Sequence, residues 1–235
     1  MKKIDCLAIS PHPDDVELFC SGVLIKLKKQ GYSIAVADLT RGELSSNGDV
    51  KSRLAESEKA KEILGLDYRL NLELTDGNLS GDHHQRMEVV NLIRTMKPVI
   101  CLIPYWKDRH PDHEAASMLL TRSLFDAGLK KIESSQPAYR PDTVLYYMMH
   151  QFFQPTFIVD ITDEMDTKIE AIEAYRSQFA MSGNGFELTY INRPEFLTSL
   201  RTRAAFLGEQ IGVKYGEGFL YKGSLKIDNI PQFFS

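Results

Sequence analysis

The sequence contains no long apolar run and only three cysteines, and both features restrict what the protein can be. No segment approaches the ~20 consecutive apolar residues that a membrane span requires. The basic N-terminus leads directly into a short strand pattern instead of the apolar region of a signal peptide. The cysteines lie inside apolar segments without metal-type spacing; they are Cys6, Cys20 and Cys101. We therefore expect buried thiols in a cytoplasmic protein that has no membrane association.

Three common sequence signatures are missing as well. The first apolar segment is not followed by Gly-x-Gly-x-x-Gly, and the chain contains no Walker-type phosphate loop, so a dinucleotide-binding role loses its main support. No Gly-x-Ser-x-Gly elbow marks a serine hydrolase. The formal net charge of −4 argues against a nucleic-acid-binding protein, so we expect no nucleic-acid partner.

Apolar periodicity predicts strands that alternate with helices. The expected strands span residues 4–9, 33–39, 68–72, 99–104, 144–149 and 157–161. The expected helices span residues 16–30, 50–64, 84–96 and 113–125, and a last helix begins at Pro194. This alternation implies right-handed crossovers and an α/β fold with a doubly wound, mostly parallel, Rossmann-like sheet and helices on both faces. No repeat or linker divides the chain, so we expect one domain over residues 1–235.

A His-Pro-Asp tripeptide occurs twice, each time after a predicted buried strand. With the residue that follows each copy, the two segments are His12-Pro13-Asp14-Asp15 and His110-Pro111-Asp112-His113. The residue before a proline is pushed out of the helical conformation, and Pro13 suits the first position of a helix with His12 just outside it. His12 and Asp15 can thus converge on one ion, whereas Asp14 points elsewhere and remains free.

The second copy supplies a second imidazole. His113 falls one turn into the next helix, three residues after His110. Two imidazoles and one carboxylate, with positions left for water, are typical of a catalytic metal site rather than a structural one. Sites in doubly wound sheets gather at the carboxyl ends of the strands, where both motifs are expected. The alternatives are that Asp14 and Asp15 are only helix-start acids, and that His110 or His113 is a surface histidine.

Arg53 is unusual in the first turn of the predicted helix 50–64. The helix dipole does not favour a cation at this end, which indicates a role beyond local stability. The alternative is a solvated arginine, or one paired with Glu56 or Ser57, because exposed pairs are common and contribute little.

These segments resemble the LmbE / PIG-L family of zinc-dependent N-deacetylases. The matching segments are residues 12–17, residues 40–43, Arg53 with Glu56, residues 110–113 and residues 213–219. Within the family the chain is most similar to the bacillithiol-pathway deacetylases, which remove the acetyl group from N-acetylglucosaminyl malate. It departs from the family pattern at Phe19 and Ser21, where small glycines are usual, and at Ser45-Ser46; these changes would alter the wall of the pocket.

The resemblance implies a metal-dependent mechanism. A divalent ion, Zn²⁺ or Fe²⁺, would be held by His12, Asp15 and His113. It would lower the pKa of its bound water towards ~7, and Asp14 would act as general base. His110, if protonated, would stabilise the tetrahedral oxyanion, and Asp112 would orient the His110 imidazole and raise its pKa.

Substrate contacts are also implied. Glu43, Arg53 and Asp76 would contact the sugar, and Arg109 would meet the malate carboxylates, because guanidinium groups suit carboxylates. The expected partner is therefore a small amino sugar, and family members are commonly homo-oligomers. One alternative is a deacetylase of another N-acetylglucosaminide, such as a chitooligosaccharide or a glycolipid precursor. Another is a non-catalytic metal-binding α/β module, although such a module has no need of a spare base at Asp14.

Overall fold

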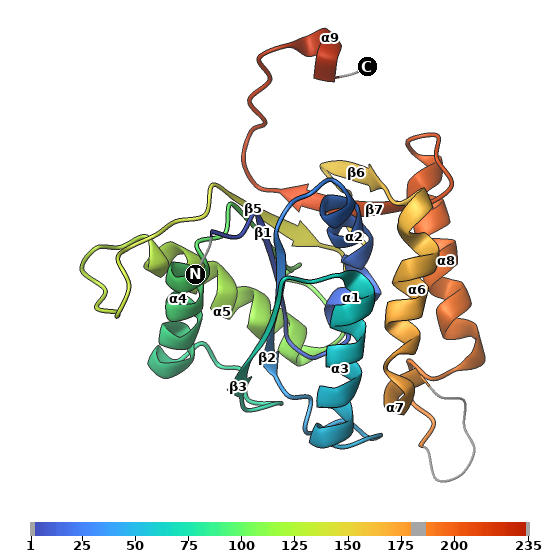
Figure 1. The fold of residues 1–235 in the computed structure, drawn as a ribbon, viewed down its shortest axis with the longest axis horizontal. Coiled ribbons are helices and arrows are strands. Elements are labelled where there is room, and N and C mark those ends of the chain that lie inside the picture. The colour runs from blue at the N-terminus through green and yellow to red at the C-terminus, as the bar shows by residue number, and fades with distance from the viewer. Residues whose placement is uncertain (1–2, 180–186, 234–235) are drawn as a thin grey trace.

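A single seven-stranded sheet forms the centre of the computed structural model, which describes residues 3–179 and 187–233 (Figure 1). The strands are β1 Cys6–Ser10, β2 Ile34–Thr40, β3 Tyr68–Leu74, β4 Ile100–Pro104, β5 Thr143–Tyr147, β6 Phe157–Asp160 and β7 Gly216–Tyr221. Their order across the sheet is β3-β2-β1-β4-β5-β7-β6. The first five strands pair in parallel, and β7 runs antiparallel to both β5 and β6. The predicted mostly parallel sheet is confirmed.

Helices cover both faces of this sheet. They are α1 Asp15–Phe19, α2 Ser21–Lys29, α3 Val50–Leu64, α4 His83–Met96, α5 Pro111–Ala127, the 3-10 helix η1 Thr162–Glu164, α6 Met165–Glu173, α7 Arg176–Phe179, α8 Pro194–Glu209 and α9 Ile230–Phe233. In Figure 1, α4 and α5 lie on one face, and α1, α2, α3, α6 and α8 lie on the other. Within the described residues, no helix has both the length and the apolar character that crossing a membrane requires.

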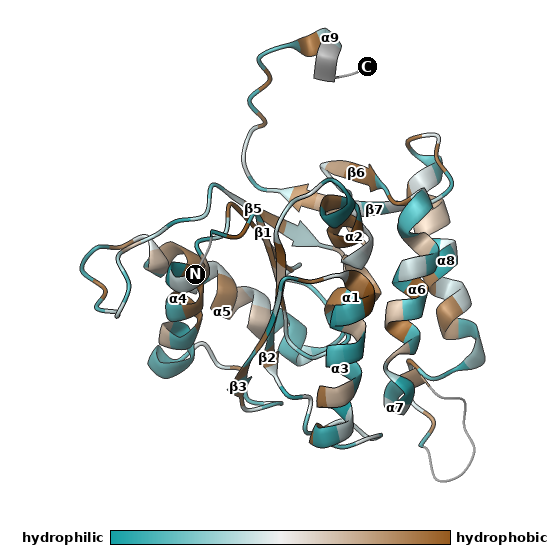
Figure 2. Cartoon of the chain, in the orientation of Figure 1, coloured by the Kyte–Doolittle hydropathy of each residue, from teal (hydrophilic) through white to brown (hydrophobic). Residues whose placement is uncertain are grey.

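Side-chain alternation in the central strands explains the two-sided core. In β1, Cys6 and Ala8 join the apolar cluster beneath α1, α2, α6 and α8, whereas Leu7 and Ile9 join the cluster beneath α4 and α5. All five residues of β1 are buried, as expected for a parallel strand covered on both sides. In Figure 2, hydrophobic (brown) and hydrophilic (teal) segments alternate along the helices that cover the sheet.

Capping residues fix the helix boundaries that the sequence predicted best. The prediction for α3 is correct at both ends. Asp49 caps it by accepting from the backbone N–H of Ser52, whose hydroxyl accepts from Asp49 in return. Gly65 ends the helix with a φ of 66°, a left-handed conformation that favours glycine.

The prediction of one continuous helix over residues 16–30 is wrong, because the chain forms two short helices there. The first begins at Asp15 rather than at Pro13, since Asp14 has a φ of 111°. The helix then breaks at Cys20, and α2 starts afresh at Ser21.

A carboxylate from a distant strand caps the second of these helices. The backbone N–H groups of Gly22 and Val23 donate to Glu217 of β7 at 2.9 and 2.8 Å. A side chain at position 22 would place its Cβ only 2.8 Å from Glu217 Oε1, so this approach requires glycine. Lys168 of α6 donates to the same carboxylate at 2.6 Å. Glu217 therefore connects β7, and through Lys168 also α6, to the first turn of α2.

The strand order places both motifs at one edge of the sheet. β1 has β2 on one side and β4 on the other, so the chain turns in opposite directions from β1 and from β4. Such a topological switch point leaves a crevice outside the carboxyl ends of the two strands. Residues 11–15 follow β1 and residues 105–113 follow β4. Both His-Pro-Asp segments therefore open into this crevice, as predicted.

Candidate metal centre

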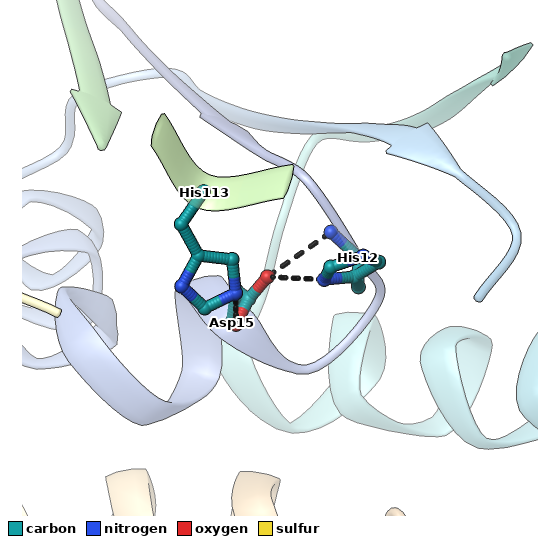
Figure 3. Close-up of side chains that lie close together, drawn as sticks. All are labelled: His12, Asp15 and His113. Atoms are coloured by element: carbon teal, nitrogen blue, oxygen red, sulfur yellow. Dashed lines mark hydrogen bonds and ion pairs between the residues drawn. The ribbon is translucent and has the colours of Figure 1, made fainter. Parts of the chain in front are cut away.

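Three side chains from the two motifs meet at the switch point (Figure 3). His12 lies in the loop after β1, Asp15 begins α1, and His113 lies in the first turn of α5. The Asp15 carboxylate lies between the two imidazoles: Oδ2 is 3.2 Å from His12 Nδ1, and Oδ1 is 3.5 Å from His113 Nε2. The backbone N–H of His12 also donates to Asp15 Oδ2 at 3.1 Å. The loop therefore fixes one carboxylate between ring nitrogens from distant parts of the chain.

The second nitrogen of each imidazole faces a further carboxylate. His113 Nδ1 is 2.9 Å from Asp108 Oδ1. His12 Nε2 is 3.1 Å from Asp76 Oδ1 and 3.5 Å from Asp112 Oδ2. Metal-binding histidines commonly place their second nitrogen against a carboxylate, which fixes the ring and makes its free nitrogen a better ligand. Both histidines have this arrangement.

The surrounding charges favour a cation at the centre of this cluster. Burial alone would raise the pKa of Asp15, but the charge of His113 and the hydrogen bonds from His12 lower it below its usual range. Burial would lower the pKa of His12, but hydrogen bonds to Asp112, Asp15 and Asp76 raise it well above its ordinary value. A bound divalent ion would supply the positive charge that these carboxylates favour, and it would replace the proton on the His12 ring.

The donor set suits a divalent transition metal. His12, Asp15 and His113 each offer one ligand atom, and these atoms lie within 4.8 Å of one another. Two imidazole nitrogens and one carboxylate oxygen suit zinc or ferrous iron, and three protein ligands leave positions open for other molecules. Two further groups meet the same distance and share a histidine with the first: Asp108, His113 and His150, and His12, Asp76 and Asp112.

Asp14 lies beside these residues but faces Arg53. Asp14 Oδ2 is 3.4 Å from Arg53 Nη2, which also donates to the carbonyl of Pro13. Both side chains are buried, so the alternative of a solvated Arg53, or one paired with Glu56 or Ser57, is excluded, and its contacts agree with a role beyond local stability. Asp14 lies outside the groups that could hold an ion, as expected, but its carboxylate is paired with Arg53. Burial raises the pKa of Asp14 to about 7 even though Arg53 opposes the change. This carboxyl group can therefore both take up and release a proton near neutral pH.

His110 and Asp112 do not form the pair that the sequence suggested. Asp112 Oδ2 accepts from the backbone N–H of Gly77 at 2.7 Å and faces His12. His110 Nδ1 instead accepts from the backbone N–H of Asp112 at 3.2 Å, which leaves the proton of the neutral ring on Nε2. His110 is exposed at the cavity, but partial desolvation of its ring and the charges of His113 and His12 lower its pKa. The charge of Asp112 does raise the pKa of His110, as expected, but the other groups outweigh it and the net shift is downward.

A cavity of about 320 Å³ opens beside the two motifs. Seven of the predicted site residues line it: His12, Asp14, Asp15, Arg53, Asp76, His110 and His113. The three other predicted site residues, Glu43, Arg109 and Asp112, are not among the described residues that line it. The Glu43 carboxylate accepts from the backbone N–H groups of Arg41 and Asp76, which joins two loops at the cavity edge. Arg109 is exposed and lies 4.1 Å over the Tyr190 ring.

Two residues at the site were not predicted. Besides facing His113, Asp108 accepts from the backbone N–H groups of His110, His150 and Gln151 at 3.0, 2.8 and 3.1 Å. His150 lines the cavity and stacks on the His113 ring, with centroids 5.7 Å apart. Asp108 follows β4 and His150 follows β5. The same strand-end rule that located the motifs could have found both.

Comparisons with known proteins identify a family for this chain. The family model described as PIG-L: GlcNAc-PI de-N-acetylase matches residues 7–124, which include both motifs. A diacetylchitobiose deacetylase from Thermococcus kodakarensis is 30% identical over 233 residues, which cover 94% of this chain and 83% of that protein.

Solved structures extend the similarity over nearly the whole chain. The conserved protein TT1542 from Thermus thermophilus has a TM-score of 0.87 and 35% identity, covering 96% of this chain and 98% of that one. The N,N′-diacetylchitobiose deacetylase from Pyrococcus horikoshii has a TM-score of 0.80 and 28% identity, covering 92% and 82%. With the paired motifs, the switch-point site and these matches in agreement, the chain belongs to the PIG-L family, described as GlcNAc-PI de-N-acetylase.

Proposed function

We propose that this chain is a divalent-metal-dependent hydrolase that removes the N-acetyl group from an N-acetylglucosamine derivative. The observation that carries the proposal is the double orientation of His12 and His113. Each imidazole turns one nitrogen towards Asp15 and the other towards an outer carboxylate. A structural zinc site closes around four protein ligands, whereas three ligands in a cavity leave room for water and substrate.

The ion would be held by His12, Asp15 and His113, and zinc and ferrous iron both suit these ligands. A bound divalent ion supplies Lewis acidity, which makes water more acidic and polarises a carbonyl group. Asp14 would accept the proton of the attacking water, because its carboxylate lines the same cavity without belonging to the ligand group. Arg53 fixes that carboxylate. A module that only binds metal would have no use for this arrangement.

His110 would stabilise the oxyanion that develops on the acetamide carbonyl. Its Nδ1 is occupied by the backbone N–H of Asp112, so the Nε2–H group is the donor that remains. When the C–N bond breaks, the proton held by Asp14 would pass to the leaving nitrogen. The products are acetate and a free amino sugar. Asp112 would act through His12, which it faces, rather than through His110.

Two N-acetylglucosaminides are the candidate substrates. Resemblance to the bacillithiol-pathway enzymes supports N-acetylglucosaminyl malate. Similarity to two diacetylchitobiose deacetylases gives comparable support to a chitooligosaccharide. For either one, Arg53 and Asp76 would contact the sugar, because both line the cavity. Arg109 would meet the malate carboxylates from outside the cavity, and Glu43 would act by holding the loop that carries Asp76.

Metal content and acetate release together test this proposal. The purified protein should contain about one divalent ion per chain and should release acetate from at least one of N-acetylglucosamine, N,N′-diacetylchitobiose and N-acetylglucosaminyl malate. His113→Ala should lose most of the metal and the activity, because two protein ligands remain. His84→Ala is the control, since His84 is exposed on α4. Full metal content in His113→Ala would remove His113 from the ligands, and no acetate from any substrate in metal-loaded native protein would refute the deacetylase function.

A further inference from the structure

A second and larger cavity adjoins the metal centre. Its volume is about 1060 Å³, against about 320 Å³ for the cavity at the metal ligands. It lies between α8 and residues 150–155, which follow β5. His150 lines both cavities, so they meet at this side chain. We refer to the larger cavity as the aromatic groove.

Besides His150, the rings of six Phe and Tyr residues line the aromatic groove: Phe19, Phe152, Phe153, Tyr190, Phe196 and Phe206. Hydrogen-bonding side chains lie among them, including Gln154, Thr202 and Gln210. Aromatic faces with a few polar groups between them suit a ring that has both an apolar face and polar substituents. In Figure 2, α8 carries hydrophobic and hydrophilic segments next to each other.

The wall of the aromatic groove is held in place by Arg203. Its guanidinium lies 4.4 Å over the Phe152 ring. It also donates to the carbonyls of Met149 and His150, at 2.9 Å for His150. Arg203 of α8 thus fixes both His150, which lies between the two cavities, and Phe152, which lines the aromatic groove. A wall fixed in this way costs little to order when a ligand binds.

The boundary between the cavities is narrow. His150 contacts Phe19 and Tyr190 edge-on, with ring centroids 5.1 and 5.4 Å away. Tyr190 lines the aromatic groove, whereas its neighbour Ile191 lines the metal cavity. One layer of side chains, which includes His150 and Tyr190, therefore separates the two cavities.

We propose that the aromatic groove is a subsite for a ring-bearing aglycone, the part of the substrate beyond the acetylated sugar. This inference rests on the proposed deacetylase function and specifies its substrate class. The metal cavity lies at the lower end of the ~300–1,000 Å³ that ligand pockets occupy, so one acetylated sugar fills most of it. A second ring must then lie outside it, and the aromatic groove is the adjoining space. The ring can be a second pyranose or an aryl group.

The test compares substrates with and without such a ring. kcat/KM for acetate release is measured with N-acetylglucosamine, its methyl and 4-nitrophenyl β-glycosides, and N,N′-diacetylchitobiose. In Phe152→Ala, kcat/KM should fall about 2- to 12-fold for the two ring-bearing glycosides, which corresponds to one aromatic contact, and stay unchanged for the other two. The control is Phe125→Ala, because Phe125 on α5 is 57% exposed, comparable to 48% for Phe152, and lies across the sheet from the groove. Equal losses for all four substrates, or no loss, would overturn the subsite.

A binding measurement separates this inference from the proposed activity. Calorimetric titration of native protein should give tighter binding of the 4-nitrophenyl glycoside than of the methyl glycoside, and Phe152→Ala should remove most of the difference. If no substrate releases acetate but this preference is present, the deacetylase function fails and the subsite stands. If the preference is absent, the subsite fails whatever the activity. Sedimentation velocity provides a third outcome: if Phe152→Ala or Phe206→Ala dissociates an oligomer, the groove is an interface between copies of the chain, and the subsite is refuted.

Discussion

Replacing Asp108 by asparagine tests whether the outer carboxylates support the metal site. The Asp108 side chain is fully buried and accepts from His113 and from three backbone N–H groups. Burial would raise its pKa, but the hydrogen bond and the charge of His113 lower it to about 2, so it is ionised at neutral pH. Asparagine keeps the size but removes the charge and one acceptor. The His113 ring would then lose the partner that directs its other nitrogen towards Asp15 and the proposed ion.

The expected loss can be stated as metal affinity. Removal of an outer partner of a ligating histidine typically costs about 10- to 100-fold in affinity, and the same range is expected for Asp108→Asn. At a free zinc concentration of 100 times the native dissociation constant, binding stabilises the native protein by about 2.7 kcal/mol. The same zinc concentration would stabilise the variant by only about 0.4 to 1.4 kcal/mol.

The assay is a zinc titration against a competing chelator, together with thermal unfolding with and without zinc. Comparing unfolding in the presence of a chelator separates the loss of backbone hydrogen bonds from the loss of metal affinity. Glu114→Gln is the matched control, because Glu114 is exposed and accepts from the Asp108 backbone N–H, not from the Asp108 side chain. If Asp108→Asn binds zinc as tightly as the native chain, the carboxylate does not support His113 as a metal ligand.

Two further variants test other parts of the site and its support. Asp14→Asn should keep its metal, because asparagine tolerates a positive φ and the proposed ligands are unchanged. Its turnover should fall about 10²–10⁴-fold, because asparagine cannot accept the proton. Near-native turnover in the metal-loaded variant would contradict this. Arg69 donates to both Asp38 oxygens at 3.0 Å and to Glu17, and all three side chains are buried. Arg69→Met should therefore lower the free energy of unfolding by about 3–5 kcal/mol, measured by urea unfolding. Arg201→Met removes an exposed ion pair and should lower it by at most about 1 kcal/mol. Equal effects would show that the buried network does not stabilise the fold.

Most of the fold could be predicted from the sequence because its signals are local. Helix α3 begins at Asp49 and ends at Gly65 as capping rules expect, and Pro111 occupies the first position of α5. The same proline rule fails at Pro13. There the carbonyl of Pro13 accepts from Arg53, and Asp14 adopts a φ of 111°, so the helix starts later. The sequence pattern is alike in both motifs, but in the structure the first one also contacts Arg53 of α3.

The sequence could not show which carboxylate faces which histidine, because this too depends on contacts between distant segments. Asp112 is two residues from His110, and that proximity suggested a pair. In the structure, Asp112 turns to His12 and to the backbone of Gly77, both distant in sequence. The side chain of a helix's first turn can face several neighbouring loops, and short sequence separation does not decide among them. Asp108 and His150, by contrast, could have been predicted from their positions after β4 and β5.

Arg53 shows how a residue that breaks a local rule can indicate the site. A cation in the first turn of a helix opposes the helix dipole, so its presence there requires a tertiary reason. That reason is Asp14, whose backbone conformation is rare for a residue other than glycine and costs about 1–3 kcal/mol. Arg53 bonds the Pro13 carbonyl and faces the Asp14 carboxylate, so one guanidinium stabilises both the unusual backbone and the buried charge. The contacts of Arg53 thus offset both the cost of a cation at the start of the helix and the cost of the Asp14 backbone conformation. They hold the Asp14 carboxylate next to the proposed metal ligands but outside their group. This separation would allow one loop to provide both the proposed metal ligand Asp15 and the proposed base Asp14.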